Sequence, residues 1–466
     1  MNSTDHRFAL HDDGCLQRLG EGTFAGTRGN DGNAPIADLW AKKAGGVTVG
    51  GALGSVASES GREGMRIGFL GGGPAGLYFA YRWKKRHPET HVDLFEQNAA
   101  NATWGFGVVF SDRAWDFLRS DDPETAEFLS PQMESWQNIT LHHANKSVEI
   151  DGVGFSAIGR LRLLMLLQAR ASEVGVQLHF ETPIGSIDQL TGYDLIVPAD
   201  GVNSIARRSF EREFETSLRY NDNKFAWYGT TLRFDTLSHT FVRTAKGAFN
   251  AHHYRYSPIM STFLVECDRG TWEAYRFSEM TDEQSRTECE QVFAATLQGH
   301  PLISNKSIWR NFPWIWNERW SFRNIVLVGD ASHTAHFSIG SGTRLAIEDV
   351  IALVSALEAE PNDLAAGLKR YEDKRRPIVE TLVAAAKASA DWYEHFPEHM
   401  HLAPLEFAMT YITRSSRIDP ARLKRMSPAF YARYEAAHSA IKSFCLVPKA
   451  DKMGAKIVPN HRSDAI

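Results

Sequence analysis

Three glycines spaced as G-x-G-x-x-G, at Gly71, Gly73 and Gly76, are the first residues in the chain whose type and spacing could do chemistry. They lie between an apolar run, RIGFL, and a stretch with helical spacing, PAGLYFAYRWKKR. Gly71 permits a tight turn, Gly73 lets the backbone approach a pyrophosphate, and Gly76 lets helix and strand pack closely. The helix start directs free N–H groups at the phosphates. The spacing therefore predicts a dinucleotide site at Gly71, Gly73, Pro74, Ala75 and Gly76.

Acidic residues follow three predicted strands. Glu96 ends HVDLFE, where its carboxylate would accept hydrogen bonds from ribose hydroxyls. Asp200 and Gly201 follow DLIVPA, and Asp330 ends NIVLVGD. In an open α/β sheet such strand ends face the ligand. Either pair taken singly could instead cap a helix, but a plain NAD dehydrogenase needs neither, so the three segments together favour FAD.

The elements that must position these residues divide the chain into five parts. A β-α-β pattern from Met65 predicts an α/β fold. Aromatic and β-branched strands between about Phe225 and Ile308 predict an inserted antiparallel sheet. The expected parts are a disordered extension (1–64), a Rossmann-like FAD-binding domain in two pieces (65–220 and 319–400), a substrate-binding β-sheet insert (221–318) and a C-terminal helical tail (401–466).

Composition excludes several classes of function. Hydrophobic residues make up 43% and charged residues 23% of the 466, as in a globular protein. A net charge of −5 gives no reason to expect nucleic-acid binding, which usually needs a concentrated basic face. No stretch reaches the roughly 20 apolar residues that span a bilayer. The four cysteines are scattered without metal-ligand spacing, so no metal is expected. No secretory signal is visible, and a cytoplasmic monomer or homodimer is expected.

The order GxGxxG, then Asp-Gly, then Gly-Asp, with a β-rich segment between the last two, resembles the single-component flavoprotein aromatic hydroxylases. This resemblance implies that FAD is held by the glycine turn, Glu96, Arg160, Asp200 and Asp330. It also places one further stretch against the flavin ring, namely Gly340, Gly342 and Thr343. One departure is visible, because many members have a Pro pair where this chain has His336 and Phe337.

A narrower resemblance rests on NATWGFGVVFSDRAWDFL, AHHYRYS, STFLVE and MTYITRSSRID. These segments are similar to those of the subgroup that contains salicylyl-CoA 5-hydroxylase and 2-aminobenzoyl-CoA monooxygenase. The implied reaction hydroxylates an aromatic acyl-CoA thioester with O2 and NADH or NADPH, through a flavin C4a-hydroperoxide. Two alternatives stay open at this point. One is a hydroxylase of an indole or tryptophan-derived intermediate, and the other is a flavin-binding protein without turnover.

The side chains that assist the reaction are harder to identify. His252 and Tyr254 would share one face of a strand and could contact a phenol, or one could face solvent while the other packs. His336 could relay a proton near the flavin, since histidine exchanges protons near neutral pH. Arg414 and Arg417 could bind the phosphates of a CoA tail, or form a solvated basic surface.

Overall fold

The computed structural model describes residues 9–10, 16–17 and 64–445. The chain divides into two compact units, Met1–Met65 and Arg66–Ile466. In the first unit β1 (Ala9–Leu10) pairs antiparallel with β2 (Leu16–Gln17). The prediction of a disordered extension otherwise falls outside the described residues. The fold and the site described below belong to the second unit.

A six-stranded sheet contains the predicted β-α-β unit. Its order is β10-β4-β3-β11-β19-β18, and the strands from β10 to β19 run parallel. The strands are β3 (Arg66–Leu70), β4 (His91–Phe95), β10 (Gln177–His179), β11 (Leu195–Pro198), β18 (Ser321–Phe322) and β19 (Ile325–Val326). The helix α2 (Pro74–Arg86) packs against α5 (Arg160–Glu173) and α10 (Gly342–Ala359). Parallel strands are usually covered by helices on both faces of the sheet, so successive residues of each strand are buried and apolar. All four residues of β11 are buried in this way.

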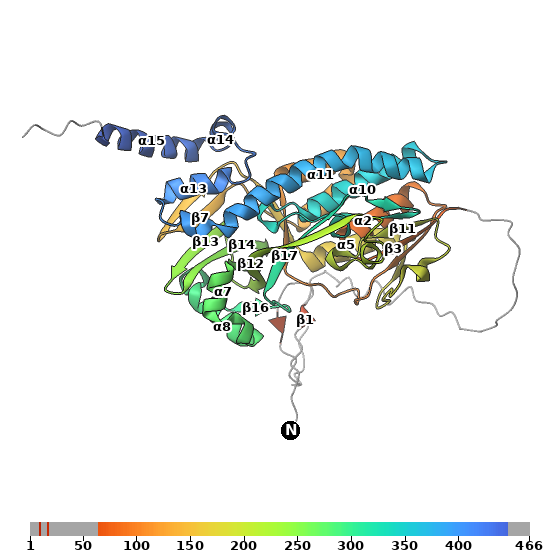
Figure 1. Ribbon diagram of the computed structural model, residues 1–466, viewed down its shortest axis with the longest axis horizontal. Helices are drawn as coiled ribbons and strands as arrows, with labels where there is room; N and C mark the ends of the chain where they lie inside the picture. The colour runs from red at the N-terminus through yellow and green to blue at the C-terminus, as the bar shows by residue number, and fades with distance from the viewer. Residues whose placement is uncertain (1–8, 11–15, 18–63, 446–466) are drawn as a thin grey trace, which may run out of the picture. The chain divides into compact units, whose positions relative to one another are not determined.

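A second, eight-stranded sheet follows the order β16-β12-β15-β14-β13-β7-β8, with β17 also paired to β12 (Figure 1). Its strands are β7 (Ile139–His143), β8 (Lys146–Ile150), β12 (Thr216–Thr230), β13 (Leu237–Thr244), β14 (Gly247–Ser257), β15 (Met260–Cys267), β16 (Leu302–Ser304) and β17 (Arg310–Asn317). Most of these strands come from the segment predicted as the insert.

Two features of this sheet differ from the prediction. The strands β7 and β8 come from the part of the chain assigned to the first piece of the FAD-binding domain. In addition, β7 pairs with β13 in parallel, so the sheet is not wholly antiparallel. Strands that are distant in the chain can pair in either direction, and hydrophobic alternation within each strand does not indicate which partner it will find.

A small sheet and several short helices complete this region. The small sheet has the order β5-β9-β6, formed by β5 (Gly107–Ser111), β6 (Glu134–Trp136) and β9 (Phe155–Gly159). The helices are α3 (Asp112–Asp121), α4 (Pro123–Leu129), α6 (Ile205–Ser209), α7 (Arg269–Tyr275), α8 (Asp282–Val292) and α9 (Ala294–Leu297).

The predicted C-terminal helical tail, as far as the structure describes it (401–445), contains α13 (Pro404–Thr413), α14 (Pro420–Met426) and α15 (Pro428–Cys445). The helices α11 (Leu364–Glu394) and α12 (Phe396–His399) precede it, in the part of the chain assigned to the FAD-binding domain. The helix α11 contacts both β18 of the parallel sheet and β12 of the second sheet (Figure 1). Phe407 and Tyr411 of α13 join a buried apolar cluster with Ile139 and Phe241 of the second sheet. Within the described ranges, no helix combines the length and apolar character that a bilayer crossing requires.

Candidate active site

The glycine turn between β3 and α2 leaves one position open to a ligand. Gly71 has a φ of +97°, and a Cβ there would lie 2.5 Å from the carbonyl oxygen of Ala199. A Cβ at Gly76 would lie 2.2 Å from the carbonyl oxygen of Gly71. At Gly73, by contrast, the nearest atom to an added Cβ is the Ala199 oxygen at 3.9 Å. Only the middle glycine therefore faces open space, as a turn that admits a pyrophosphate requires.

The carboxylate of Glu96 is held beside this turn. Its Oε2 accepts a hydrogen bond from the backbone N–H of Gly72 at 2.7 Å. Its Oε1 accepts from the backbone and side-chain nitrogens of Asn98 at 2.8 and 2.6 Å. Oε2 can accept one further hydrogen bond, since a carboxylate oxygen has two acceptor positions. Glu96 therefore fits the predicted role of holding a ribose hydroxyl.

The three predicted FAD-binding segments converge at one edge of the parallel sheet. A Cβ at Gly71 would lie 2.8 Å from the Cα of Asp200, and one at Gly329 would lie 3.4 Å from the Cβ of Ala75. Asp200 accepts a hydrogen bond from the N–H of Ile205 at 2.7 Å through Oδ2. Its Oδ1 is buried and finds no partner among the described residues. Such an atom is costly to leave unsatisfied, so it fits a ligand hydroxyl.

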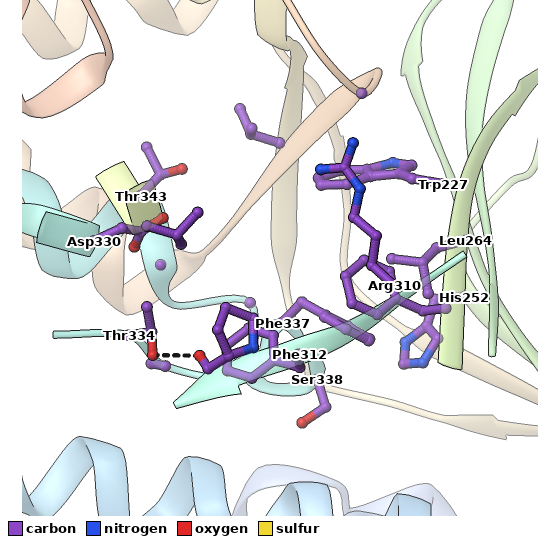
Figure 2. A pocket seen from close by; sticks show the side chains of 18 of the residues that line it. Trp227, His252, Leu264, Arg310, Phe312, Asp330, Thr334, Phe337, Ser338 and Thr343 are labelled. Carbon is purple, nitrogen blue, oxygen red and sulfur yellow. Dashed lines mark hydrogen bonds between the residues drawn. The ribbon is translucent and has the colours of Figure 1, made fainter. Parts of the chain in front are cut away.

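Asp330 and Arg160 face a cavity of about 1150 Å³, which lies between the parallel sheet and the second sheet. The Asp330 side chain is exposed to the cavity. Desolvation by the surrounding protein raises the pKa of its carboxyl, whereas the positive charge of Arg160 acts to lower it. Burial lowers the pKa of Arg160 in turn. Gly340, Gly342 and Thr343 line the same cavity. Figure 2 shows Asp330 and Thr343 opposite side chains of the second sheet. The residues present therefore fit FAD, with its dinucleotide part at the glycine turn and its ring toward the cavity.

A row of four cross-strand neighbours forms the opposite wall of the cavity. His239 of β13 pairs with His252 of β14, which pairs with Leu264 of β15, which pairs with Trp227 of β12. Directly paired residues point to the same face of a sheet, and all four line the cavity. His252, Leu264 and Trp227 follow one another along this wall in Figure 2.

The expected alternation on β14 is confirmed. His252 and Tyr254 both line the cavity, whereas His253 does not. The His253 ring stacks on Phe263 at 5.3 Å on the other face, and its Nε2 lies 2.9 Å from Thr240 Oγ1. The hydroxyl of Tyr254 donates to the carbonyl oxygen of Gly107 at 2.9 Å, and burial raises its pKa.

His252 has a buried carboxylate partner. Its Nε2 lies 3.3 Å from Oε2 of Glu266, and Oε1 of Glu266 accepts from Asn223 at 2.9 Å. Burial lowers the pKa of His252 although Glu266 acts to raise it. Burial acts to raise the pKa of Glu266. The hydrogen bond from His252 and the charges of neighbouring groups together outweigh the effect of burial, so the pKa of Glu266 is lowered. We therefore assign a neutral His252 with its proton on Nε2, which donates to an ionised Glu266.

The cavity also contains a polar group that the sequence analysis missed. His239 lies between two tyrosines, with its Nε2 2.7 Å from the hydroxyl of Tyr411 and its Nδ1 3.3 Å from that of Tyr393. The His239 ring is 4.6 Å from that of His252. Burial holds the pKa of His239 well below its usual value. The one signal in the sequence was Tyr411, which belongs to the MTYITRSSRID segment noted above.

Three other predicted residues lie in different settings. His336 is buried but is not among the lining residues; its Nδ1 accepts from the N–H of Ser338, and burial lowers its pKa to about 4. Arg414 lines the cavity, but its guanidinium donates to Ser389 at 2.9 Å and to the carbonyl oxygens of Ser338 and Tyr411 at 2.8 and 2.7 Å. Arg417 is exposed and does not line the cavity. The structure thus brings His252 and Tyr254 to the cavity that the FAD-binding candidates line. It places His336 behind two lining rings, those of Phe312 and Phe337, and Arg417 outside the lining.

Comparison with known proteins agrees with this geometry. Residues 192–386 match the FAD binding domain family. The chain is 38% identical over 361 residues to salicyloyl-CoA 5-hydroxylase of a Streptomyces species, covering 75% of this chain and 70% of that protein. It is 37% identical over 335 residues to 3-hydroxy-4-methyl-anthranilyl-[aryl-carrier protein] 5-monooxygenase of Streptosporangium sibiricum, covering 72% of this chain and 90% of that protein.

Among solved structures, the tetrameric form of 2-methyl-3-hydroxypyridine-5-carboxylic acid oxygenase has the same fold. Its TM-score is 0.59 at 18% identity, and the match covers 80% of this chain and 98% of that one. The relatives are named as enzymes, which argues against a flavin-binding protein without turnover. The chain therefore belongs to the FAD-dependent aromatic monooxygenases, enzymes that bind FAD and use a nicotinamide co-substrate.

Proposed function

We propose that this monooxygenase hydroxylates the ring of an aromatic acyl-CoA thioester of the salicyloyl-CoA kind, with O2 and NADH or NADPH. The relatives support a thioester, because one acts on a CoA derivative and the other on an aryl group carried by a protein. An ortho-hydroxyl or amino group on the ring would activate the position that is attacked.

The observation that carries the proposal is the character of the buried cavity wall. A free aromatic acid would need a cation for its carboxylate. The buried histidines of this wall, His239 and His252, have lowered pKa values and are neutral near pH 7. Arg414 already donates to three protein acceptors. The other lining cations among the described residues are Arg160, which is assigned to FAD, Arg207, which donates to backbone carbonyl oxygens, and the exposed Arg208, Lys306 and Arg310. No cation of the described lining is therefore left for a carboxylate beside the two histidines, and a thioester removes the charge that would need one.

The side chains around the cavity would orient the ring and handle its protons. Phe312 and Phe337, whose rings are 6.0 Å apart, and Leu264 give apolar surface against which an aromatic ring packs and water is excluded. FAD, when bound, supplies the activation of O2. The hydroxyl of Tyr411 and Nε2 of His239 lie close enough to pass a proton, and both line the cavity. We infer that this pair takes the proton from a substrate phenol during hydroxylation.

The test is steady-state NAD(P)H consumption with matched pairs of acid and thioester: salicylate and salicyloyl-CoA, 2-aminobenzoate and 2-aminobenzoyl-CoA, 4-hydroxybenzoate and 4-hydroxybenzoyl-CoA. Each thioester should stimulate consumption far more than its acid, and the product should carry one new ring hydroxyl. Equal kcat/KM for the two members of every pair would refute the thioester. Strong stimulation by a free indole would instead favour the tryptophan-derived class of substrate.

A further inference from the structure

The mouth of the cavity carries an unusual group of exposed side chains. Of the nine large hydrophobic residues that are exposed in the described part of the chain, five line this one cavity. They are Trp104, Val202, Leu218, Tyr220 and Ile308. Exposed apolar residues gathered at one opening are typical of a binding surface rather than of ordinary solvent-facing protein.

Two cations stand at the same mouth, on the side of the second sheet. Arg310 begins β17, lines the cavity and is exposed. Its backbone pairs with Phe225 of β12, but its guanidinium makes no hydrogen bond or ion pair with any residue between 64 and 445. Lys306 precedes it in the β16–β17 turn, with its Nζ 3.8 Å from the ring centroid of Trp104. Among the described residues, six cations and two carboxylates line the cavity, although the net charge of the chain is −5. The described lining is therefore much more basic than the protein as a whole.

The turn that presents Lys306 is firmly held. Asn305 donates from its side chain to the carbonyl oxygens of Thr103 and Gly105 at 3.1 and 3.0 Å, and Ser307 donates to the carbonyl oxygen of Trp227. Lys306 itself has a φ of +56°, in the left-handed region that a lysine rarely adopts. Backbone held in this region against its preference is commonest at functional sites.

The row of cross-strand neighbours connects this mouth to the polar end of the cavity. From His239 through His252 and Leu264 to Trp227 there are three steps between adjacent strands, about 14 Å in total. The proton-accepting pair of His239 and Tyr411 is at one end. Trp227 is at the other end, and its carbonyl oxygen accepts a hydrogen bond from Ser307 in the turn that carries Lys306. In Figure 2, Arg310 and Trp227 lie on the side opposite Asp330 and Thr343, away from the candidate flavin residues.

We propose that Arg310 and Lys306 bind the phosphate groups of the CoA tail, while the pantetheine arm crosses Leu264 and Trp227 and the aryl ring lies at the His239 end. This inference rests on the proposed function and extends it to a subsite. A ligand with an aromatic ring at one end, an apolar arm and phosphates at the other matches the sequence of surfaces along the wall. Phosphate binding at two cations accounts for an arginine without a protein partner.

The experiment compares salicyloyl-CoA with salicyloyl-pantetheine, which has the same ring and arm but no phosphate. The variants of the holoenzyme are Arg310→Gln, Lys306→Gln and the double variant, and Arg269→Gln is the control because Arg269 is exposed on α7 and does not line the cavity. Each single variant should lower kcat/KM for the CoA thioester roughly fivefold, as expected for an exposed cation and a phosphate. All variants should leave the pantetheine thioester within about twofold of wild type, and the control should change neither.

Binding gives a second readout that does not depend on turnover. Adenosine 3′-phosphate 5′-diphosphate, the CoA tail without its arm, should compete with salicyloyl-CoA and bind the double variant more weakly by calorimetry. Rising ionic strength should weaken its binding to wild type more than to the double variant. An unchanged ratio of kcat/KM between the two thioesters in the double variant would overturn the inference. Loss of bound flavin, or a raised KM for NAD(P)H in that variant, would also overturn it by assigning the cations to another ligand.

Three outcomes distinguish this inference from a protein-docking mouth and from failure of the proposed function. If an aryl thioester on an acyl carrier protein is used better than the CoA thioester, the mouth docks a protein and the CoA assignment is wrong. If salicylate and both thioesters are used equally well by wild type, the proposed function itself fails. If wild type prefers the thioester to the acid but the variants have no effect, only the phosphate subsite is refuted.

Discussion

The Nε2 atom of His252 lies 3.3 Å from Oε2 of Glu266, and both side chains are buried beside the cavity. A buried carboxylate is stable only when donors satisfy it. Glu266 has two, since Asn223 donates to its other oxygen at 2.9 Å. This arrangement fixes the tautomer of His252 and leaves its Nδ1 without a proton, so the charge of Glu266 determines which way the histidine can exchange protons.

Glu266→Gln should lower the free energy of unfolding at pH 7 by about 1.5–3 kcal/mol, because it removes the ionised acceptor of the hydrogen bond from His252. The folded-state pKa of Glu266 is lowered, so its stabilisation is present above the unfolded pKa of about 4.5. It is lost as the pH falls through the folded pKa. Urea unfolding should therefore show wild type and variant converging below pH 4.5. A difference that grows as the pH falls would contradict this assignment.

His336→Asn should weaken the acid sensitivity of the fold. Burial lowers the pKa of His336 to about 4, whereas an unfolded histidine titrates near 6.5. Between these values the unfolded chain binds a proton that the folded chain does not, so stability falls as the pH drops from 6.5 to 4, by about 3 kcal/mol in total. The variant should lose this slope, and the exposed His401→Asn should retain it. Equal slopes in urea titrations of both variants would show that His336 is not the group responsible.

Gly73→Val and Gly76→Ala should separate flavin binding from folding. An added Cβ meets nothing closer than 3.9 Å at Gly73, where φ is −75°, but meets the Gly71 carbonyl oxygen at 2.2 Å at Gly76. Gly73→Val should therefore leave the apoprotein Tm nearly unchanged and abolish FAD binding, while Gly76→Ala should lower the apoprotein Tm. Flavin absorbance per chain and thermal unfolding of the apoproteins measure the two effects. A full flavin spectrum in Gly73→Val would mean that the turn does not hold the phosphates.

Tyr411→Phe tests the proposed proton pathway. The change removes the hydroxyl 2.7 Å from Nε2 of His239 and leaves a buried nitrogen without that partner, at a cost of about 1–3 kcal/mol. We expect kcat to fall at least about tenfold with normal flavin content. Tyr393→Phe is the comparison, since its hydroxyl lies 3.3 Å from Nδ1 of the same ring and should matter less. A kcat unchanged in Tyr411→Phe would remove this tyrosine from the pathway.

Arg414→Gln and Arg417→Gln distinguish structural from substrate-binding cations in the C-terminal region. Arg414 joins α13 to Ser389 of α11 and to the Ser338 carbonyl, so its loss should cost about 2 kcal/mol of stability. Arg417 is exposed, and its substitution should change stability by less than about 0.5 kcal/mol. The KM for salicyloyl-CoA should be unchanged in Arg417→Gln if the CoA phosphates bind at Arg310 and Lys306. A roughly tenfold rise would place the phosphates over the C-terminal helices instead.

Three features could be predicted from the sequence alone: the dinucleotide turn, the acidic residues at the strand ends and the helices of the C-terminal region. Each depends on chemistry within a short stretch: a strand, a glycine turn and a helix start specify one another over about 30 residues. The alternation that puts His252 and Tyr254 on the cavity face is equally local, because successive side chains of a strand point to opposite faces.

The contacts between residues that are distant in the chain could not be predicted from the sequence. His239 and Tyr411 are 172 positions apart, and no periodicity in either segment indicates that α13 covers β13. The parallel pairing of β7 with β13, the partners of Arg414 and the burial of His336 behind the lining residues have the same origin. Such contacts depend on how whole elements pack, and a local pattern specifies the face of an element that is buried but not the element that buries it.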